Sequence, residues 1–385
     1  MPLRRLTKFS RIELEAEKDE LARLIEELDL ILADDKELRR VVSEELAAVA
    51  KAYGTPRRTV LLESAGQSVS AAVPLEVADD PCWVYLSSTG LLARTTDAEP
   101  PGEGGARGTH DVVVSAVAAT ARGQVGALTT QGRLVRLDVL DLPTLPPTAN
   151  SPHLQGGQPI SMFLALEGDE DVLALCSLAT EGQGLALGTA QGVVKRVNPE
   201  VLGKDSWEVI RLAEGDRVVG AVELRTGKEE VCFVTSDAQL LHFSADGVRP
   251  QGRSGGGVAG VRVAAGERVV FFGALDPEAP DPVLVTVAGS SDALPGTEAG
   301  SVKVTPFADY PAKGRATGGV RCHRFLRGED TLQIAWVGPA PAMAAAGSGQ
   351  PVDLPAAEGR RDGSGTPAPQ AIAGVAGPVS VRLSP

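Results

Sequence analysis

The sequence lacks the features that mark several large classes of protein. Its 385 residues contain no run of about 18 uncharged apolar residues, so no segment is predicted to cross a membrane. No basic stretch followed by an apolar one opens the chain, so we expect no secretory signal and a cytoplasmic protein. With 43% hydrophobic and 23% charged residues, the chain is predicted to be neither disordered nor a coiled-coil rod throughout.

Residues that bind metals or form cross-links are also scarce. The four cysteines, Cys82, Cys176, Cys232 and Cys322, are far apart and form no C-x-x-C pair, which predicts neither a disulfide framework nor a zinc site. We expect them to be small core residues in a reducing compartment. The four histidines do not stand at metal-ligand spacing from one another or from a cysteine. We therefore expect no metal site and no cofactor in this chain.

Catalytic motifs are matched only by accident. Gly252–Gly256 fits G-x-S-x-G and Gly255–Gly260 fits G-x-G-x-x-G, but the residues that follow alternate like a strand, whereas both motifs need a helix there. No nucleophile has a plausible base beside it. We therefore predict no catalytic residue.

The overall charge argues at first against a nucleic-acid partner. The formal net charge is −13, and an acidic chain is a poor first candidate for binding DNA. Aromatic residues are few, whereas there are 44 glycines and 27 prolines. Frequent turn residues favour a chain of short strands.

The first 63 residues differ from the rest. They contain no glycine before Gly54 and are rich in helix-forming residues. Leu14, Leu21 and Leu28 stand seven residues apart, and Asp34-Asp35 interrupts the pattern before a second helix that is predicted to end at Tyr53. Two interpretations stay open from this pattern: an amphipathic helix packed on its own domain, and one arm of an antiparallel coiled coil.

From residue 64 onward the sequence repeats one unit. An apolar strand is followed by a small turn residue and by a second strand that usually carries a basic residue. The six copies are 84–94, 125–136, 185–196, 231–242, 283–304 and a degraded one that begins at Leu332. A spacing of about 40 to 60 residues is typical of radial β repeats, and a closed ring leaves only short edges.

A second repeat lies within the first. Gly252–Val258 and Gly314–Val320 agree at five of seven positions, and each contains an arginine, Arg253 or Arg315. A glycine loop that exposes arginines can follow a phosphate backbone without steric obstruction. The acidic average therefore hides local basic loops.

These motifs resemble the C-terminal half of a bacterial type IIA DNA topoisomerase A subunit, the family of the DNA gyrase A subunit and its topoisomerase IV counterpart. The helix that ends in Lys51–Thr59 resembles the family's sequence at that point, and Leu3–Phe9 is similar to the point where its coiled-coil arm re-enters. The blade hairpins and later-blade motifs of the family are similar to Thr89–Arg94, Gln191–Arg196, Val248–Arg262 and Lys313–Gly319. The resemblance runs from residue 3 to about residue 337.

The resemblance implies a mainly β fold: a six-bladed β-pinwheel preceded by an α-helical coiled-coil segment. The expected boundaries are 1–56 for the helical arm and base, 57–63 for a linker, 64–337 for blades one to five and the start of six, and 338–385 for a degenerate last blade and an Ala/Gly/Pro-rich tail. In the family the outer rim binds and bends duplex DNA without sequence specificity and presents it to the DNA gate.

The sequence departs from the family in two ways. The gate region with the catalytic tyrosine has no counterpart here, so we expect this chain to be inactive alone. ATP and Mg²⁺ are then expected only in the complete enzyme with its B subunit. The glycine-rich loop of the first blade, residues 100–108, carries only one arginine, Arg107, and one glutamate. A loop with fewer cations releases fewer counterions from DNA and so binds it less tightly. This favours a topoisomerase IV-like protein over a supercoiling gyrase.

The resemblance therefore implies three kinds of partner: duplex DNA, the ATPase B subunit and the gate region of the complete enzyme. It also implies association with the nucleoid and leaves self-association through the N-terminal helix open. The predicted DNA-binding residues are Arg94, Arg107, Arg136, Lys195, Arg196, Arg249, Arg253, Arg262, Lys313, Arg315, Arg321 and Arg324. Two alternatives remain: a gyrase C-terminal domain that wraps DNA for negative supercoiling, and a non-enzymatic propeller scaffold that binds protein.

Overall fold

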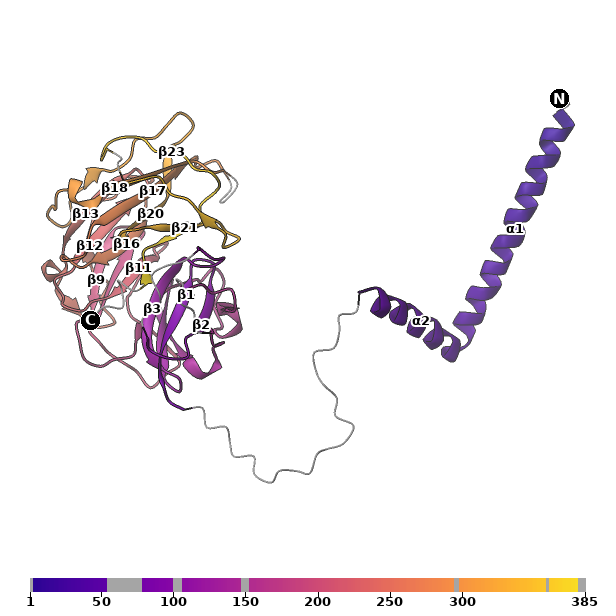
Figure 1. Ribbon diagram of the computed structural model, residues 1–385, viewed down its shortest axis with the longest axis horizontal. Coiled ribbons are helices and arrows are strands. Elements are labelled where there is room, and N and C mark those ends of the chain that lie inside the picture. The colour runs from indigo at the N-terminus through magenta and orange to yellow at the C-terminus, as the bar shows by residue number, and fades with distance from the viewer. Residues whose placement is uncertain are drawn as a thin grey trace, which may run out of the picture. The chain divides into compact units, whose positions relative to one another are not determined.

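The computed structural model describes residues 3–53, 78–99, 106–146, 152–293, 298–357 and 360–379 (Figure 1). The chain divides into two compact units, Met1–Leu75 and Glu76–Pro385. The predicted Gly54 cap, the predicted linker and residues 100–105 lie outside the described residues. Within the described part of the chain, no helix is long and apolar enough to cross a membrane.

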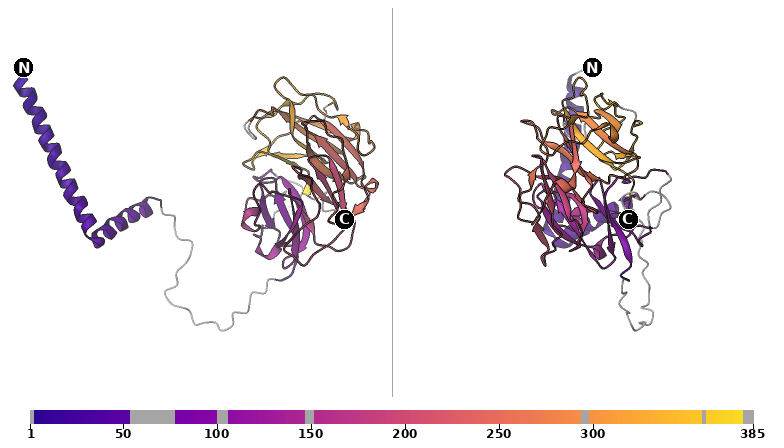
Figure 2. Two further views of the ribbon diagram at one scale, coloured as in Figure 1. Left: turned by 180° about the vertical axis from the view of Figure 1, so that it is seen from behind. Right: turned by 90° about the vertical axis from the view of Figure 1, so that its left-hand side faces the viewer.

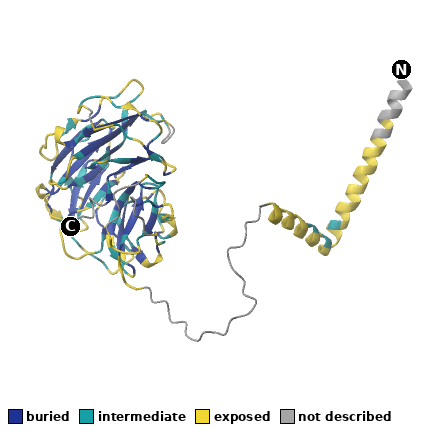
Figure 3. Cartoon of the chain, in the orientation of Figure 1, coloured by how far each residue is buried: buried dark blue, intermediate teal, exposed yellow. Residues whose placement is uncertain are grey.

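The first unit consists of two helices, α1 (Leu3–Ala33) and α2 (Asp35–Tyr53). The predicted break between them is confirmed, because Asp34 caps α2: its Oδ1 accepts a hydrogen bond of 2.9 Å from the main-chain N–H of Lys36. The side chains of Leu14, Leu21 and Leu28 are 63%, 52% and 49% exposed. Figure 3 shows that exposed residues cover most of both helices.

The second unit contains six sheets, each built around an antiparallel hairpin, which confirms the predicted mainly β pinwheel (Figures 1 and 2). The central hairpins are β1 (Pro81–Ser87) with β2 (Leu91–Arg94), β4 (Gln124–Thr129) with β5 (Arg133–Asp138), β8 (Leu185–Thr189) with β9 (Val193–Val197), β12 (Glu230–Thr235) with β13 (Gln239–Ser244), β17 (Pro282–Gly289) with β18 (Ser301–Pro306), and β21 (Met343–Ala345) with β22 (Pro351–Val352).

One strand of each sheet lies on the inside of the ring. These inner strands are β3 (Val113–Thr120), β7 (Val172–Ser177), β11 (Val218–Glu223), β16 (Val269–Leu275), β20 (Thr331–Pro339) and β24 (Gly374–Ala376). Each contacts the inner strand of the next sheet, and β24 contacts β3, so the ring is closed. The opposite edge of each sheet therefore faces outward.

The outward edges are formed by very short strands. They are β6 (Gln158–Pro159), β10 (Ser206–Glu208), β14 (Pro250–Gln251), β15 (Val258–Ala259), β19 (Val320–Arg321) and β23 (Thr366–Pro367). Each follows the hairpin of the next blade: β6 completes the first sheet but comes after the β4–β5 hairpin. Neighbouring blades are thus linked by an exchanged strand. Short 3-10 helices precede or follow some of these segments, at Val139–Asp141, Ile160–Met162, Ala245–Gly247 and Phe307–Asp309.

The apolar core is divided between the blades. Large buried clusters join blades one and two, two and three, three and four, four and five, and five and six. A smaller cluster of Val112, Ala345 and Ala376 joins the first and last blades. All four cysteines are free and buried, as predicted. Burial raises the pKa of the Cys322 thiol to about 12, so it behaves as a core residue.

The loop after the first hairpin completes this last junction. The Arg107 guanidinium donates to the main-chain oxygens of Val352 (3.1 Å) and Ala344 (2.7 Å) in blade six, and it pairs with the buried Asp111 at 2.8 Å. The main-chain N–H of His110 also donates to the oxygen of Gly349 at 2.8 Å. Residues 106–111 therefore contact the sixth blade, much as an exchanged strand contacts each of the other five blades.

The hairpin turns follow the predicted chemistry. Gly192 has φ +83°, and a Cβ there would lie 2.5 Å from the oxygen of Val261. In the fourth hairpin Ala238 replaces the glycine and adopts φ +60°. That conformation is uncommon for an alanine, and the hairpin pairing around it imposes it.

The start of the sixth hairpin was predicted wrongly. The strand at Leu332 is β20, which pairs with β17 as the inner strand of blade five. Blade six begins at Met343, and its hairpin strands contain only three and two residues. Such short alanine- and proline-containing strands carry no alternation that a sequence pattern could detect.

Candidate nucleic-acid interface

The basic residues of the second hairpin strands point into the molecule. In blade three, the buried Arg196 donates from Nη1 to the oxygen of Ala245 at 3.1 Å and from Nη2 to Oε1 of Gln183 at 3.2 Å. In blade two, Arg136 donates from Nε to the oxygen of Lys204 at 2.8 Å. Both carbonyls belong to chain that arrives from the next blade. The repeated basic residue therefore binds the exchanged segment.

This geometry corrects part of the predicted DNA-binding set. Lys195 and Arg196 are buried, so their side chains cannot reach a phosphate. Arg107 and Arg136 are half-buried and occupied by main-chain acceptors. Arg94 is half-buried, and its Nε is enclosed without a partner. A pattern that reads "basic after a glycine turn" does not distinguish these internal donors from surface cations.

The remaining predicted cations are exposed and lie in the outer segments of blades three and four. They are Arg249, Arg253, Arg262, Lys313, Arg315, Arg321 and Arg324. Their contact with DNA stays a prediction. Arg253 lies 3.7 Å from the carboxylate of Glu200, but both side chains are about half exposed, so this pair is weak.

Two glycine loops form most of this surface. The third-blade loop, 252–257, connects β14 to β15, and the fourth-blade loop, 313–319, leads into β19. They are continuous, because Nη1 of Arg315 donates to the oxygen of Ala259 at 2.7 Å and the main-chain N–H of Arg262 donates to the oxygen of Thr317 at 3.0 Å. The two sequence repeats are thus neighbours in space.

A third basic loop is not among the sequence predictions. The fifth-blade loop, 360–365, leads into β23 and exposes Arg360 and Arg361. It occupies the same outer position in blade five that the fourth-blade loop occupies in blade four. The signal that could have found it is Gly363 and Gly365 just after the two arginines, in a stretch whose composition is typical of a low-complexity tail.

Carboxylates occupy the other edge of the sheets. In five blades an acidic residue stands two positions before the inner strand: Asp111, Glu170, Asp216, Glu267 and Glu329. Each accepts a hydrogen bond, for example Glu267 from Ser236 at 2.6 Å and Asp216 from the main-chain N–H of Gln191 at 3.0 Å. Exposed cations such as Arg217 and Arg268 stand directly after two of these acids, so the start of the inner strands carries both signs of charge.

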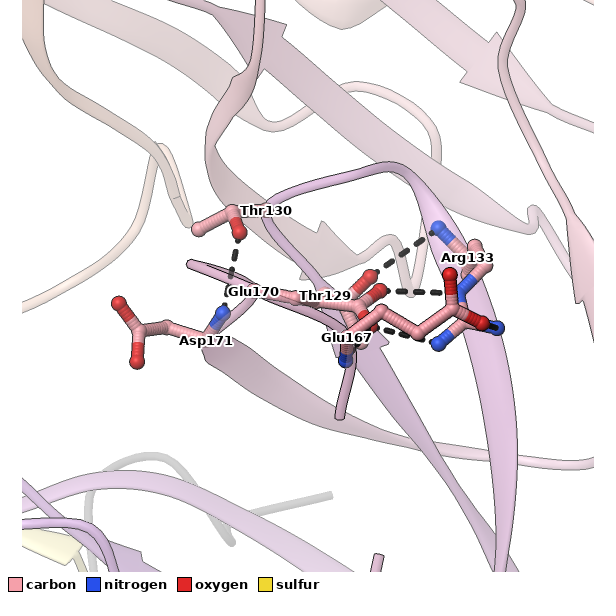
Figure 4. A network of polar contacts seen from close by, with 6 residues as sticks. All are labelled: Thr129, Thr130, Arg133, Glu167, Glu170 and Asp171. Atoms are coloured by element: carbon pink, nitrogen blue, oxygen red, sulfur yellow. Dashed lines mark hydrogen bonds and ion pairs between the residues drawn. The ribbon is translucent and has the colours of Figure 1, made fainter. Parts of the chain in front are cut away.

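The strongest of these carboxylate contacts is shown in Figure 4. Arg133 donates to the buried Glu170 carboxylate through Nη2 at 2.6 Å and Nε at 2.9 Å, and it lies 3.2 Å from the exposed Glu167. The hydrogen bond from Arg133 lowers the pKa of Glu170 to about 2. This pair joins β5 to the start of β7, so the Glu170 carboxylate is occupied by an internal contact. Across the described ranges, no group of three His, Cys, Asp or Glu residues could hold a metal.

Fold and surface together define a class: a closed β-pinwheel with interlocked blades and exposed basic loops on the outer side of several blades. The family model described as "DNA gyrase C-terminal domain, beta-propeller" matches residues 229–276 and 296–329. The DNA gyrase A subunits of Staphylococcus epidermidis (strain ATCC 12228 / FDA PCI 1200) and Staphylococcus aureus (strain MRSA252) are each 30% identical over 364 aligned residues, covering 87% of this chain. The chain spans 38% of the length of these relatives.

Solved structures agree on the fold. The C-terminal domain of DNA topoisomerase IV matches with a TM-score of 0.58 at 17% identity, covering 78% of this chain and 93% of that one. A DNA gyrase A C-terminal domain matches with a TM-score of 0.52 at 17% identity, covering 77% and 99%. The resemblance inferred from the sequence is therefore confirmed: in sequence and fold the chain is similar to the C-terminal part of type IIA DNA topoisomerase A subunits.

Proposed function

We propose that the chain binds duplex DNA along the outer edge of the pinwheel and bends it, so that a type II topoisomerase can present a DNA segment to its gate. The observation that carries the proposal is the continuous exposed surface of the third- and fourth-blade loops, with Arg253, Arg262, Lys313 and Arg315. All four cations are exposed, although Lys313 and Arg315 each give one donor to a main-chain oxygen. Exposed cations can contact phosphates and release the counterions that are condensed on the DNA. Such binding would be independent of DNA sequence, because no base contact is involved.

A topoisomerase IV-like role is supported by the first-blade loop. Residues 100–106 contain no lysine or arginine, and the one arginine of the loop, Arg107, is bound to the main chain of blade six. This loop therefore adds no free cation to a DNA path. A disc with fewer free cations would bend DNA and release it more readily than one built to wrap it tightly.

Duplex binding can be tested directly with the full chain. A duplex of mixed sequence should be retained at low salt and lost by about 0.3 M salt, and the logarithm of the affinity should fall linearly with the logarithm of the salt concentration. Absence of retention at any salt concentration would contradict the proposal and favour a protein-binding scaffold.

Wrapping for negative supercoiling is the second candidate, because the relatives named above are gyrase subunits at 30% identity. Plasmid topology after treatment with a nicking-closing enzyme distinguishes the two. A chiral wrap leaves a change in linking number, whereas simple bending leaves none. We expect no linking-number change at physiological salt.

The complete activity would need further components. By the resemblance, ATP and Mg²⁺ would act in a B subunit, and strand cleavage would require the gate region of the complete enzyme. Catalysis is proposed for that assembly and not for this chain alone.

The exposed leucines of α1 suggest a further contact within such an assembly. We propose that the seam formed by Leu14, Leu21 and Leu28 pairs with another helix, in the manner of a coiled coil. Light scattering of the full chain should show concentration-dependent association, and replacing the three leucines with lysine should abolish it. A monodisperse monomer at all concentrations would contradict self-association.

A further inference from the structure

One position of the repeated hairpin divides the blades into two groups. The residue three places after the turn is Ala93, Val135 or Leu241 in blades one, two and four. In blades three and five it is Lys195 or Lys303. Both lysines are buried, at 0% and 3% exposure. Since three blades place an apolar residue there, the fold itself does not require a lysine.

Each of the two lysines is enclosed by three main-chain oxygens. Nζ of Lys195 donates to the oxygens of Val209 (2.7 Å), Arg253 (2.9 Å) and Gly255 (2.7 Å). Nζ of Lys303 donates to those of Arg360 (3.0 Å), Arg361 (2.8 Å) and Gly363 (3.0 Å). An ammonium has three donors and no acceptor, so each of these sites uses its full capacity.

Five of these six acceptors belong to the loops that expose arginines, and the sixth, Val209, directly follows β10. In the third-blade loop the oxygen of Arg253 faces Lys195, while the Arg253 side chain is 50% exposed. In the fifth-blade loop the oxygen of Arg360 faces Lys303, while its side chain is 87% exposed. The Arg360 guanidinium lies 3.9 Å from the half-exposed carboxylate of Asp362, a pair that is weak because both groups are in contact with solvent. The main-chain oxygens of each loop thus point inward to the buried ammonium, while the arginine side chains point to solvent.

The fourth blade reaches a similar arrangement without a buried lysine. There Lys313, within the loop itself, donates from Nζ to the oxygen of Gly319 at 2.8 Å, and Arg315 binds Ala259. The equivalent hairpin position is the apolar Leu241. In blade four the loop is therefore held by its own side chains and by a contact with the neighbouring loop. In blades three and five the loop is held by a buried lysine of the hairpin.

We propose that Lys195 and Lys303 are positioning residues for DNA binding, and that the fifth-blade loop is an additional phosphate-binding segment. Each lysine fixes one loop so that Arg253 in blade three, and Arg360 with Arg361 in blade five, face the phosphate backbone. This inference rests on the proposed function. It extends the basic surface from blades three and four to blade five.

The arginines of the fifth-blade loop are tested first, because they are exposed and their removal should not disturb folding. The affinity of the full chain for a duplex of about 40 base pairs is measured by fluorescence anisotropy over a series of salt concentrations. Replacing both Arg360 and Arg361 with alanine should flatten the slope of log affinity against log salt by about one to two units. Lys228→Ala, which removes an exposed cation from a turn, is the matched control and should leave the slope unchanged.

The lysine is tested next with Lys303→Leu, which copies the residue found in blade four. It should flatten the slope by a similar amount, although Lys303 cannot touch DNA. Combined with the two arginine replacements, it should cause no further flattening. In the absence of DNA, trypsin should cleave after Arg360 or Arg361 faster in Lys303→Leu than in wild type. The same pair of measurements applies to Lys195→Leu with Arg253→Ala.

The outcomes separate this inference from the proposed function. If wild-type protein does not bind duplex DNA, the proposed function fails. If wild type binds with a clear salt slope but the arginine replacements leave it unchanged, only the fifth-blade assignment fails. Three results would overturn the positioning role and make the lysines structural. The lysine variant could weaken binding at an unchanged slope, or its effect on the slope could add to that of the arginine replacements. It could also lose its cooperative thermal transition.

Discussion

Two sets of basic residues in blade three are close in space but differ in what they bind. Arg196, on β9, is buried and donates to Ala245 and Gln183. Arg253, in the outer loop, is half exposed, and its guanidinium lies 3.7 Å from the half-exposed carboxylate of Glu200. The first holds an exchanged segment in place, and the second is available to a ligand. The role of a basic residue in this repeat therefore depends on the acceptor that it binds and not on its distance from the turn glycine.

The comparison also explains how an acidic protein can present a basic surface. The net charge of −13 is a sum over the whole chain and does not show where the charges lie. Five acids stand before the inner strands, and several of them are satisfied by internal donors, as Glu170 is by Arg133 and Asp111 by Arg107. Several exposed cations lie together on the outer segments of blades three and four. Overall acidity therefore limits the affinity for DNA without excluding it.

The largest effect is expected where an internal cation and its carboxylate form a buried pair. Glu170→Gln should lower the free energy of unfolding by about 3 kcal/mol, because the partly buried Arg133 guanidinium would keep only the exposed Glu167 as a counter-charge. Urea denaturation measures this change. Glu167→Gln is the control on the same arginine: Glu167 is 81% exposed, so its loss should cost less than about 1 kcal/mol. Equal effects would contradict the distinction between internal and exposed partners.

The same pair predicts a dependence on pH. Because the pKa of Glu170 is about 2 in the folded protein and near its usual value of 4.5 in the unfolded chain, the unfolded chain binds more protons between these values. The stability that the pair provides is present above pH 4.5 and is lost as the pH falls towards 2. The difference in unfolding free energy between wild type and Glu170→Gln should shrink over this range. A difference independent of pH would show that the charge of Glu170 is not responsible.

A smaller effect is expected for the strand cation that binds uncharged acceptors. Arg196→Met keeps the aliphatic part of the side chain but removes the donors to Ala245 and Gln183. It should cost about 2 kcal/mol, because buried acceptors lose their partners. Arg253→Ala should change the unfolding free energy by less than about 0.5 kcal/mol. Thermal denaturation of the two variants sharpens the comparison, and a large loss of stability for Arg253→Ala would refute the assignment of that loop to binding.

Much of the fold could be predicted because the hairpins carry their own local signals. Five of them combine an apolar run, a turn residue with φ above zero and a second strand, as in the turn at Gly192. The outer strands could not be found, since β14, β15, β19 and β23 contain two residues each and have no period. Their pairing is set by tertiary contacts with the preceding blade.

The candidate site was predicted only in part, for a physical reason. Charge in a sequence normally indicates exposure, because burying an unpaired cation is costly. Lys195 and Arg196 violate that expectation, because main-chain oxygens from chain far along the sequence enclose them. Those acceptors cannot be read from the residues near either side chain. The fifth-blade loop was missed for the opposite reason, since its two arginines stand in a stretch whose composition resembles a disordered tail.

The most direct test compares the salt dependence of DNA binding for the two sets of cations in one experiment. Arg253→Ala combined with Arg315→Ala should flatten the slope of log affinity against log salt by about one to two units, because two phosphate contacts and their released counterions are lost. Arg196→Met, measured where it is fully folded, should keep the wild-type slope. A flattened slope for Arg196→Met with an unchanged slope for the loop variant would contradict the account.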